Sequence, residues 1–293
     1  MTIGKTGIAE VEEQIQKYWG PLSASQLTQT NPLLGVVNRN YEGVLRAKGD
    51  TAYVSVLRPF TGRTQTVGTD ADTFVADKVS MVRTAIKADK VFYHAVELES
   101  LAELQSQLDS NDAGLRSLMT QAVNDQINKY LYSFVKPSIV DGSTGDSGVS
   151  TMSKDVFKGA RVFAGAQKWP KDGNWFSLLD PSFYADINVD TVLANTDYVP
   201  NPVIEGGNEF RKILDFKAAE DNSLPTAQGL FFHREWLYFV MQLQPVFKIS
   251  DLHSSYKRGI LLSVDVVGGA AKNAYAGDLL HYPVYNSAWT AVS

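Results

Sequence analysis

The tetrapeptide GDSG at residues 145–148 is the stretch of this sequence whose residue types come closest to a catalytic motif. Ser147 stands where chymotrypsin-like serine proteases carry their nucleophile, next to a histidine that takes the hydroxyl proton and an aspartate that orients the histidine. The protease chain order needs that histidine upstream, and His94 is the only histidine there. Val149 stands where the oxyanion-hole glycine should follow. We therefore interpret the tetrapeptide as part of a loop.

Three glutamates at short spacing could act as a general acid and a general base. Glu97 and Glu99 share one face of a strand, whereas Glu99 and Glu103 share one face of a helix. Nothing in the neighbouring sequence suggests a pocket that would tune them for catalysis. We interpret them as solvated surface residues.

The remaining chemical motifs are also absent. The four histidines, at positions 94, 233, 253 and 281, lack the HExxH spacing of a zinc site, and Asp251 with His253 does not define one alone. The sequence has no P-loop and no GxGxxG motif. It therefore predicts no catalytic residue, no metal site and no bound cofactor.

Composition narrows the class of protein. The chain of 293 residues is 44% hydrophobic and 20% charged, which is typical of a globular protein. Its net charge of −5 argues against tight nucleic-acid binding, which usually needs a basic face. The lack of cysteine favours folding in a reducing cytoplasm. We expect no signal peptide and no membrane insertion, because charged residues interrupt every long apolar run.

The first forty residues predict a helix followed by an arm. Ile8, Val11, Ile15 and Trp19 recur at helical spacing with glutamates opposite, which indicates a short amphipathic helix that docks on protein. Residues 20–40 show neither helical nor strand periodicity. They are typical of an arm that lies on another surface.

Two runs, 44–58 and 74–98, are rich in β-branched and aromatic residues and predict strands joined by a long polar tip. Charged residues, Arg58 and Arg63 among them, occur on both sides of this hairpin. An isolated hairpin is marginally stable in water. We therefore expect it to need a partner surface, from its own core or from another subunit.

The clearest element is a helix over 112–135, where apolar residues recur every three or four positions before Pro137 ends it. Residues 137–152 predict a loop, and 153–168 predict a second helix with Ser153 as its cap. A short strand, WFSLL, precedes a helix capped by Asp180 with Pro181 at its first position. Mostly strands are expected from residue 203 onward, the strongest being 229–247 and 257–267. The aromatic cluster within this region is expected to be core: Phe231, Phe232, Trp236, Tyr238 and Phe239.

Four stretches, in this order, resemble the major capsid proteins of tailed bacteriophages. Residues 38–99 resemble that family's extended loop with its flanking strands, and 112–135 (DAGLRSLMTQAVNDQINKYLYSFV) its spine helix. Residues 175–187 (WFSLLDPSFYADI) are similar to a segment of the axial domain, and 256–282 to the closing strands. Together they cover well over half of the chain.

The resemblance implies an α+β fold, the capsid-subunit fold that tailed phages share with herpesviruses and encapsulins. It divides the chain into an N-terminal arm, 1–40, and an extended loop hairpin, 41–88. It also implies a peripheral domain, formed by 89–150 with 256–293 and containing the spine helix 112–135, and an axial domain, 151–255.

The implied function is structural. Such subunits self-assemble into hexamers and pentamers that form the icosahedral shell around double-stranded DNA, in a virion assembled in the host cytoplasm. A separate scaffolding protein, a portal and a decoration protein are the other implied partners. We expect the inter-subunit contacts to include Ile8, Val11, Ile15 and Trp19 of the arm, and Arg58 and Arg63 of the extended loop.

Two alternatives remain open at this point. An encapsulin-like compartment has the same fold but packages a cargo protein, and a hydrolase would use Ser147 or the group Glu97, Glu99 and Glu103. Some family members also join subunits by a lysine–asparagine isopeptide bond. Lys48 or Lys78 with Asn273 are candidates here. Because no local motif matches, we do not predict this bond in the present chain.

Overall fold

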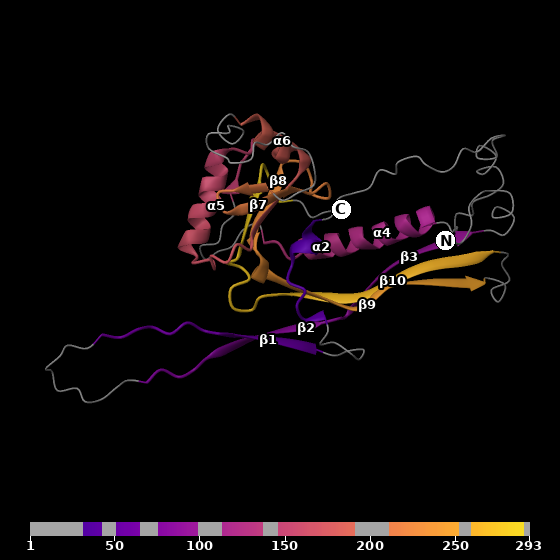
Figure 1. The fold of residues 1–293 in the computed structure, drawn as a ribbon, viewed down its shortest axis with the longest axis horizontal. Helices are drawn as coiled ribbons and strands as arrows, with labels where there is room; N and C mark the ends of the chain where they lie inside the picture. Colours follow the sequence, from indigo (N-terminus) through magenta and orange to yellow (C-terminus); the bar gives the residue numbers. More distant parts are fainter. Residues whose placement is uncertain are drawn as a thin grey trace.

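The computed structural model describes residues 32–42, 51–64, 76–98, 113–136, 146–190, 211–251 and 259–289. These form a two-stranded, a three-stranded and a six-stranded sheet, together with helices that pack on the two larger sheets. Figure 1 shows the two-stranded hairpin extending well beyond the rest of the chain. The predicted helix with Ile8, Val11, Ile15 and Trp19 lies outside the described residues.

The six-stranded sheet has the strand order β4-β11-β8-β5-β7-β6. Its central strands, β5 (Trp175–Leu179) and β8 (Gln228–His233), are buried along their whole length, as continuous apolar runs predict. The outer strands are β7 (Phe216–Glu220), β6 (Arg211–Ile213), β11 (His281–Tyr285) and β4 (Asp146–Ser147). β4 corrects part of the predicted loop 137–152, because its two residues pair in parallel with β11.

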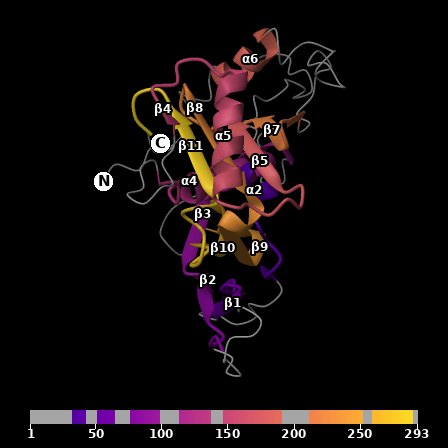
Figure 2. The same cartoon turned by 90° about the vertical axis from the view of Figure 1, so that its left-hand side faces the viewer.

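Two helices accompany this sheet. α5 (Lys154–Ala166) packs on its face, with Phe157 edge-on to Phe231 at 5.1 Å (Figure 2). α6 (Pro181–Val189) begins as predicted, because the Asp180 carboxylate accepts hydrogen bonds from the backbone N–H groups of residues 182 and 183. Ser153 takes the N-cap position of α5, as predicted, although its side chain makes no capping hydrogen bond.

The three-stranded sheet, with the order β3-β10-β9, carries the long helix on one face. α4 (Ala113–Tyr132) runs along β3 (Lys90–Leu98), β10 (Ile260–Lys272) and β9 (Leu237–Asp251) in Figure 1. The apolar stripe of α4 and every second residue of β10 are buried together: Met119, Val123, Ile127, Leu131, Leu262, Val264 and Val266. The helical repeat of α4 and the two-residue repeat of β10 thus place their apolar side chains in one core. The helix ends three residues earlier than the predicted 135.

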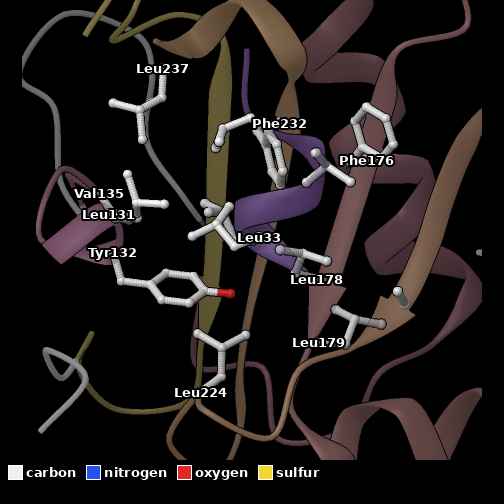
Figure 3. Close-up of a cluster of buried hydrophobic side chains, with 14 of the residues drawn as sticks. Leu33, Leu131, Tyr132, Val135, Phe176, Leu178, Leu179, Leu224, Phe232 and Leu237 are labelled. Atoms are coloured by element: carbon white, nitrogen blue, oxygen red, sulfur yellow. The ribbon is translucent and has the colours of Figure 1, made fainter. Parts of the chain in front are cut away.

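Part of the predicted arm belongs to the core. α2 (Leu33–Val36) is a single buried turn within a stretch that shows no periodicity in the sequence. Figure 3 shows Leu33 between Leu131 and Val135 on one side and Leu178 of β5 on the other. Two backbone hydrogen bonds then connect this segment to β9: the Asn38 N–H donates to the Leu237 carbonyl, and the Phe239 N–H donates to the Asn38 carbonyl. Residues 32–38 therefore pack on their own chain.

The hairpin consists of β1 (Thr51–Leu57) and β2 (Met81–Lys87) in antiparallel register. The predicted β-rich run 74–98 contains two strands, because Ala88 and Asp89 separate β2 from β3, and these pair in different sheets. One hairpin face packs its own small cluster against the start of β9: Ala52, Val54, Ile86, Tyr238 and Val240. The hairpin thus has a partner surface within its own chain at this end.

The sheets do not divide the chain where the predicted domains do. β9, expected in the axial segment 151–255, pairs with β10 in the sheet that carries α4. β11, expected in the peripheral segment 256–293, pairs with β8 in the six-stranded sheet. The short connections between β8 and β9 (η2, Arg234–Trp236) and between β10 and β11 (273–280) carry the chain from one sheet to the other, and sequence periodicity does not report which sheet a strand joins.

A buried polar joint connects α4 to the six-stranded sheet. The Tyr132 hydroxyl donates to the Asp221 carboxylate at 2.6 Å, and the Ser223 N–H donates to the other oxygen at 2.9 Å. Asn128 of α4 donates to the Ser223 hydroxyl at 2.6 Å. Burial raises the pKa of Asp221 more than these hydrogen bonds lower it. The joint therefore relies on donors from both layers.

We expect Asp221→Ala to destabilise the fold by about 2 kcal/mol, because it leaves the buried Tyr132 hydroxyl without its acceptor. Urea unfolding followed by circular dichroism measures this loss. The matched control is Asp89→Ala, at an exposed carboxylate 4.0 Å from the ammonium of Lys90, with an expected loss below about 0.5 kcal/mol. Equal unfolding midpoints for the two variants would contradict a role of the joint in stability.

Candidate subunit-contact surfaces

The predicted contact residues Arg58 and Arg63 lie beyond β1 and β2, where the two limbs of the hairpin continue. The Arg58 N–H donates to the Ser80 carbonyl at 3.0 Å, which keeps the limbs paired. The guanidinium of Arg63 donates to Asp77 at 2.6 Å in an exposed ion pair. Both arginines are therefore on the projecting hairpin, and the arm residues predicted beside them are outside the described ranges.

The limbs enclose a shallow hollow of about 470 Å³. Its lining combines charged groups with one exposed aromatic ring: Arg58, Pro59, Phe60, Thr61, Arg63, Asp77, Lys78 and Ser80. The Phe60 side chain is 63% exposed. A ring flanked by arginines is a common composition for the centre of a protein–protein contact.

The outward face of the hairpin carries three exposed apolar side chains. Tyr53, Leu57 and Met81 are 65%, 53% and 57% exposed. Leu57 pairs with Met81, and Tyr53 lies four pairs along on the same face, opposite Ala85, with the pair Ser55–Arg83 between them. The sequence alternation that buries Ala52 and Val54 thus leaves a second row in solvent, whose large apolar members are Tyr53, Leu57 and Met81. Exposed apolar side chains gathered on one face indicate a candidate interaction site.

A second open surface lies on the three-stranded sheet, on the face opposite α4. Val91 and Tyr93 of β3 are 59% and 67% exposed there. Next to Tyr93 on the same face is Asp265, whose carboxylate accepts from the Lys248 ammonium at 2.7 Å. The hairpin covers this face only at its other end, near Gly269. The open part presents apolar residues bordered by an ion pair.

The candidate catalytic residues do not come together. Ser147 pairs with Tyr285 in the six-stranded sheet, whereas His94 pairs with Val264 in the three-stranded sheet. His281 shares a strand with Tyr285 but is about 13 Å away along it at the usual rise per residue. Glu97 lies on β3 opposite Leu261, and Glu99 and Glu103 fall outside the described residues.

Sequence reasoning missed one histidine–carboxylate pair. His233 is fully buried, and its Nδ1 accepts from the Glu235 N–H at 3.1 Å, so Nε2 carries the proton that it shares with Asp172 at 3.0 Å. Desolvation opposes ionisation of Asp172, but hydrogen bonds from Asn174 and His233 outweigh it and lower its pKa to about 2. Both ring nitrogens are occupied, so the pair holds the loop before β5 in place.

Two further observations concern chemistry. Within the described ranges, no group of histidine and carboxylate residues has the arrangement of a metal site. Asn273, the cross-link candidate, is buried, and its amide is used within its own chain: it donates to the Glu235 carbonyl and the Tyr238 hydroxyl and accepts from the N–H groups of residues 275 and 276.

Of the helices in the described part of the chain, none has the length and apolar character of a membrane span.

The layers and the projecting hairpin define the fold of phage capsid subunits, as the resemblance implies. The chain matches a structure from Mycobacterium phage Che8 with a TM-score of 0.70 at 12% identity, over 92% of this chain and 96% of that one. It matches the capsid structure of the cyanophage P-SCSP1u with a TM-score of 0.65 at 12% identity, over 96% and 95%. For the mature capsid of bacteriophage PhiM1 the TM-score is 0.62 at 11% identity, over 92% and 91%. No protein-family model matches the sequence, and neither does any curated protein.

Proposed function

We propose that this chain is the major capsid protein of a tailed bacteriophage. It self-assembles into hexamers and pentamers that form the icosahedral shell around double-stranded DNA. The observation that carries this proposal is the agreement in fold, over more than nine-tenths of both chains, with chains from structures of phage capsids. These neighbours also favour a virion shell over an encapsulin-like compartment.

In this proposal each layer has a role in the shell. The β1–β2 hairpin with its limbs is the extended loop, and the three-stranded sheet with α4 is the core of the peripheral domain. The six-stranded sheet with α5 and α6 is the core of the axial domain. The sheet topology supports moving β9 to the peripheral part and β11 to the axial part.

Contacts between subunits use surfaces that one chain leaves uncovered. A neighbouring subunit covers the exposed apolar side chains of the hairpin, Tyr53, Leu57 and Met81, and the hollow around Phe60. The predicted helix with Ile8, Val11, Ile15 and Trp19 also packs against a neighbouring subunit. A shell subunit needs such surfaces and needs no active site. Its place is the virion capsid, assembled in the host cytoplasm, with a scaffolding protein, a portal and a decoration protein as further partners.

Charge reversal on the hairpin tests this assignment. Arg63→Glu places a carboxylate against Asp77, and Arg58→Glu removes a cation from the same hollow. We expect both variants to lose shell formation at least tenfold, while their thermal unfolding stays within a few degrees of the parent protein. Negative-stain electron microscopy and light scattering of the protein expressed alone measure assembly.

Arg63→Lys is the matched control, because it keeps the charge and the partner Asp77, and it should assemble. Normal shells from both glutamate variants would contradict the placement of the hairpin at a subunit contact. A parent protein that stays monomeric or dimeric under all conditions, with and without candidate scaffolding proteins, would contradict the shell function itself.

A further inference from the structure

A hollow of about 450 Å³ opens at the end of the six-stranded sheet, away from the surfaces discussed above. It lies between the loop before β5 and the β6–β7 hairpin, and its lining is mainly charged: Lys171, Asp172, Gly173, Asn174, Trp175, Lys212, Asp215 and Lys217. Both walls have defined backbone geometry. Leu214 and Asp215 form a two-residue turn with φ of 45° and 77°, and Gly173 has φ of 77°.

The carboxylates of this hollow already have hydrogen-bond or ion-pair partners within the protein. Asp172 accepts from His233 and from both the backbone and the side chain of Asn174. Asp215 accepts from the Arg161 guanidinium at 2.8 Å, and this guanidinium also lies 5.1 Å from the centre of the Trp175 ring. Neither carboxylate contacts a lysine of the hollow within ion-pair distance.

The lysines of the hollow, in contrast, lie close to other lysines. Lys212 and Lys217 are directly opposite in the β6–β7 register. Like charges opposite each other on neighbouring strands destabilise a sheet. Lys217 lies over the Phe176 ring at 5.3 Å, and Lys171 adds a third ammonium from the facing loop. In the part of the chain that the structure describes, none of the three ammonium groups has a carboxylate within 4.0 Å.

We propose that this hollow binds a phosphate group between Lys171, Lys212 and Lys217. A phosphate oxyanion there relieves the repulsion of the opposed lysines, and ammonium groups bind phosphate as point charges without a fixed approach direction. Its source is either free phosphate or the backbone of nucleic acid. Only the second source rests on the proposed capsid function, because it requires this site to face the enclosed DNA.

The test compares the unassembled parent protein with the double variant Lys212→Gln and Lys217→Gln. Inorganic phosphate should raise the unfolding temperature of the parent, with an affinity at least about tenfold above that of the double variant. Without phosphate, the double variant should unfold at a slightly higher temperature than the parent, because the opposed charges are gone. Phosphate also stabilises proteins by exclusion from their surface, and this effect is common to both proteins.

Lys158→Gln on the exposed side of α5 is the control and should keep the phosphate response. A second titration uses a 20-base-pair DNA duplex at low salt, read by fluorescence anisotropy. Weaker DNA binding by the double variant assigns the site to nucleic-acid phosphate, and unchanged DNA binding assigns it to free phosphate. An equal phosphate response in parent and double variant would overturn the proposal, whether or not the protein forms shells.

Discussion

Replacing Gly269 by alanine is expected to displace the β1–β2 hairpin from the three-stranded sheet. A Cβ at this position would lie 1.8 Å from the Lys87 carbonyl oxygen and 2.8 Å from the Lys87 carbonyl carbon. These are backbone atoms of β2, so no side-chain rotation relieves the clash. The hairpin must move away from β10, and its buried residues Ala52, Val54 and Ile86 lose contact with β9. We expect a loss of about 3 kcal/mol in the docking of the hairpin.

Hydrogen exchange measures this displacement locally. The paired amides of β1 and β2 should exchange about a hundredfold faster in Gly269→Ala, since an isolated hairpin is marginal in water, while the amides of β5 and β8 keep their protection. Shell formation should fail in the same variant. The control is Gly62→Ala on the hairpin limb, where a Cβ meets no atom within 4 Å. Unchanged protection of β1 and β2 would contradict the close approach at Gly269.

Elements with strong local patterns could be predicted from the sequence. The α4 stripe from Met119 to Leu131 repeats at helical spacing, and it is buried as expected. The Asp180–Pro181 pair marks the start of α6 because capping depends on neighbouring residues alone. The aromatic cluster around Phe231 and Trp236 is core, in agreement with its low share of charged residues.

Features that depend on distant contacts could not be predicted. The turn Leu33–Val36 is too short to show a period, and it is helical because its side chains fill the space between two layers. The break at Ala88 and Asp89 lies within a continuous β-branched run, so periodicity does not locate it, and only the family resemblance put a boundary there. The sheet membership of β9 has the same cause.

The candidate contact surface could likewise be predicted only in part from the sequence. Mixed charge around Arg58 and Arg63 predicted a hairpin that needs a partner, and this surface remains the proposed contact. The apolar row of Tyr53 and Leu57 is visible as alternation, but alternation does not tell which row is covered by the chain itself. The opposed pair Lys212 and Lys217 becomes visible only when the register is known.

Acid is expected to destabilise this fold through His281, which anchors the end of α4. The ring is fully buried and stacks on Trp236 at 5.1 Å between centres. Its Nδ1 donates to the Gly277 carbonyl at 2.9 Å, and its Nε2 accepts from the Lys136 N–H at 3.2 Å, so the bonds suit a neutral imidazole. Burial lowers its pKa most, and the nearby charge of Lys272 lowers it further, to about 4, although Asp278 favours the cation.

The unfolded chain takes up a proton at the ordinary histidine pKa of 6.5, whereas the folded chain does so only at about 4. Between these two pH values the unfolded state binds more protons, so the free energy of unfolding falls as the pH is lowered, by about 1.4 kcal/mol for each pH unit. The full loss is about 3 kcal/mol and falls mostly above pH 4, whereas Asp172, with a pKa of 3.8 in the unfolded chain and about 2 in the folded one, contributes mainly below that pH.

Urea unfolding of the unassembled protein at pH 7.5 and pH 4.5 measures this dependence. His281→Gln should be less stable than the parent at pH 7.5, since glutamine does not fill the stacked position on Trp236, but it should lose about 2 kcal/mol less between the two pH values. The slope, and not the absolute stability, isolates the proton, because lost packing weakens the variant equally at both pH values. An identical loss in parent and variant would show that another group takes up the proton and that the buried ring is not the acid-sensitive anchor of α4.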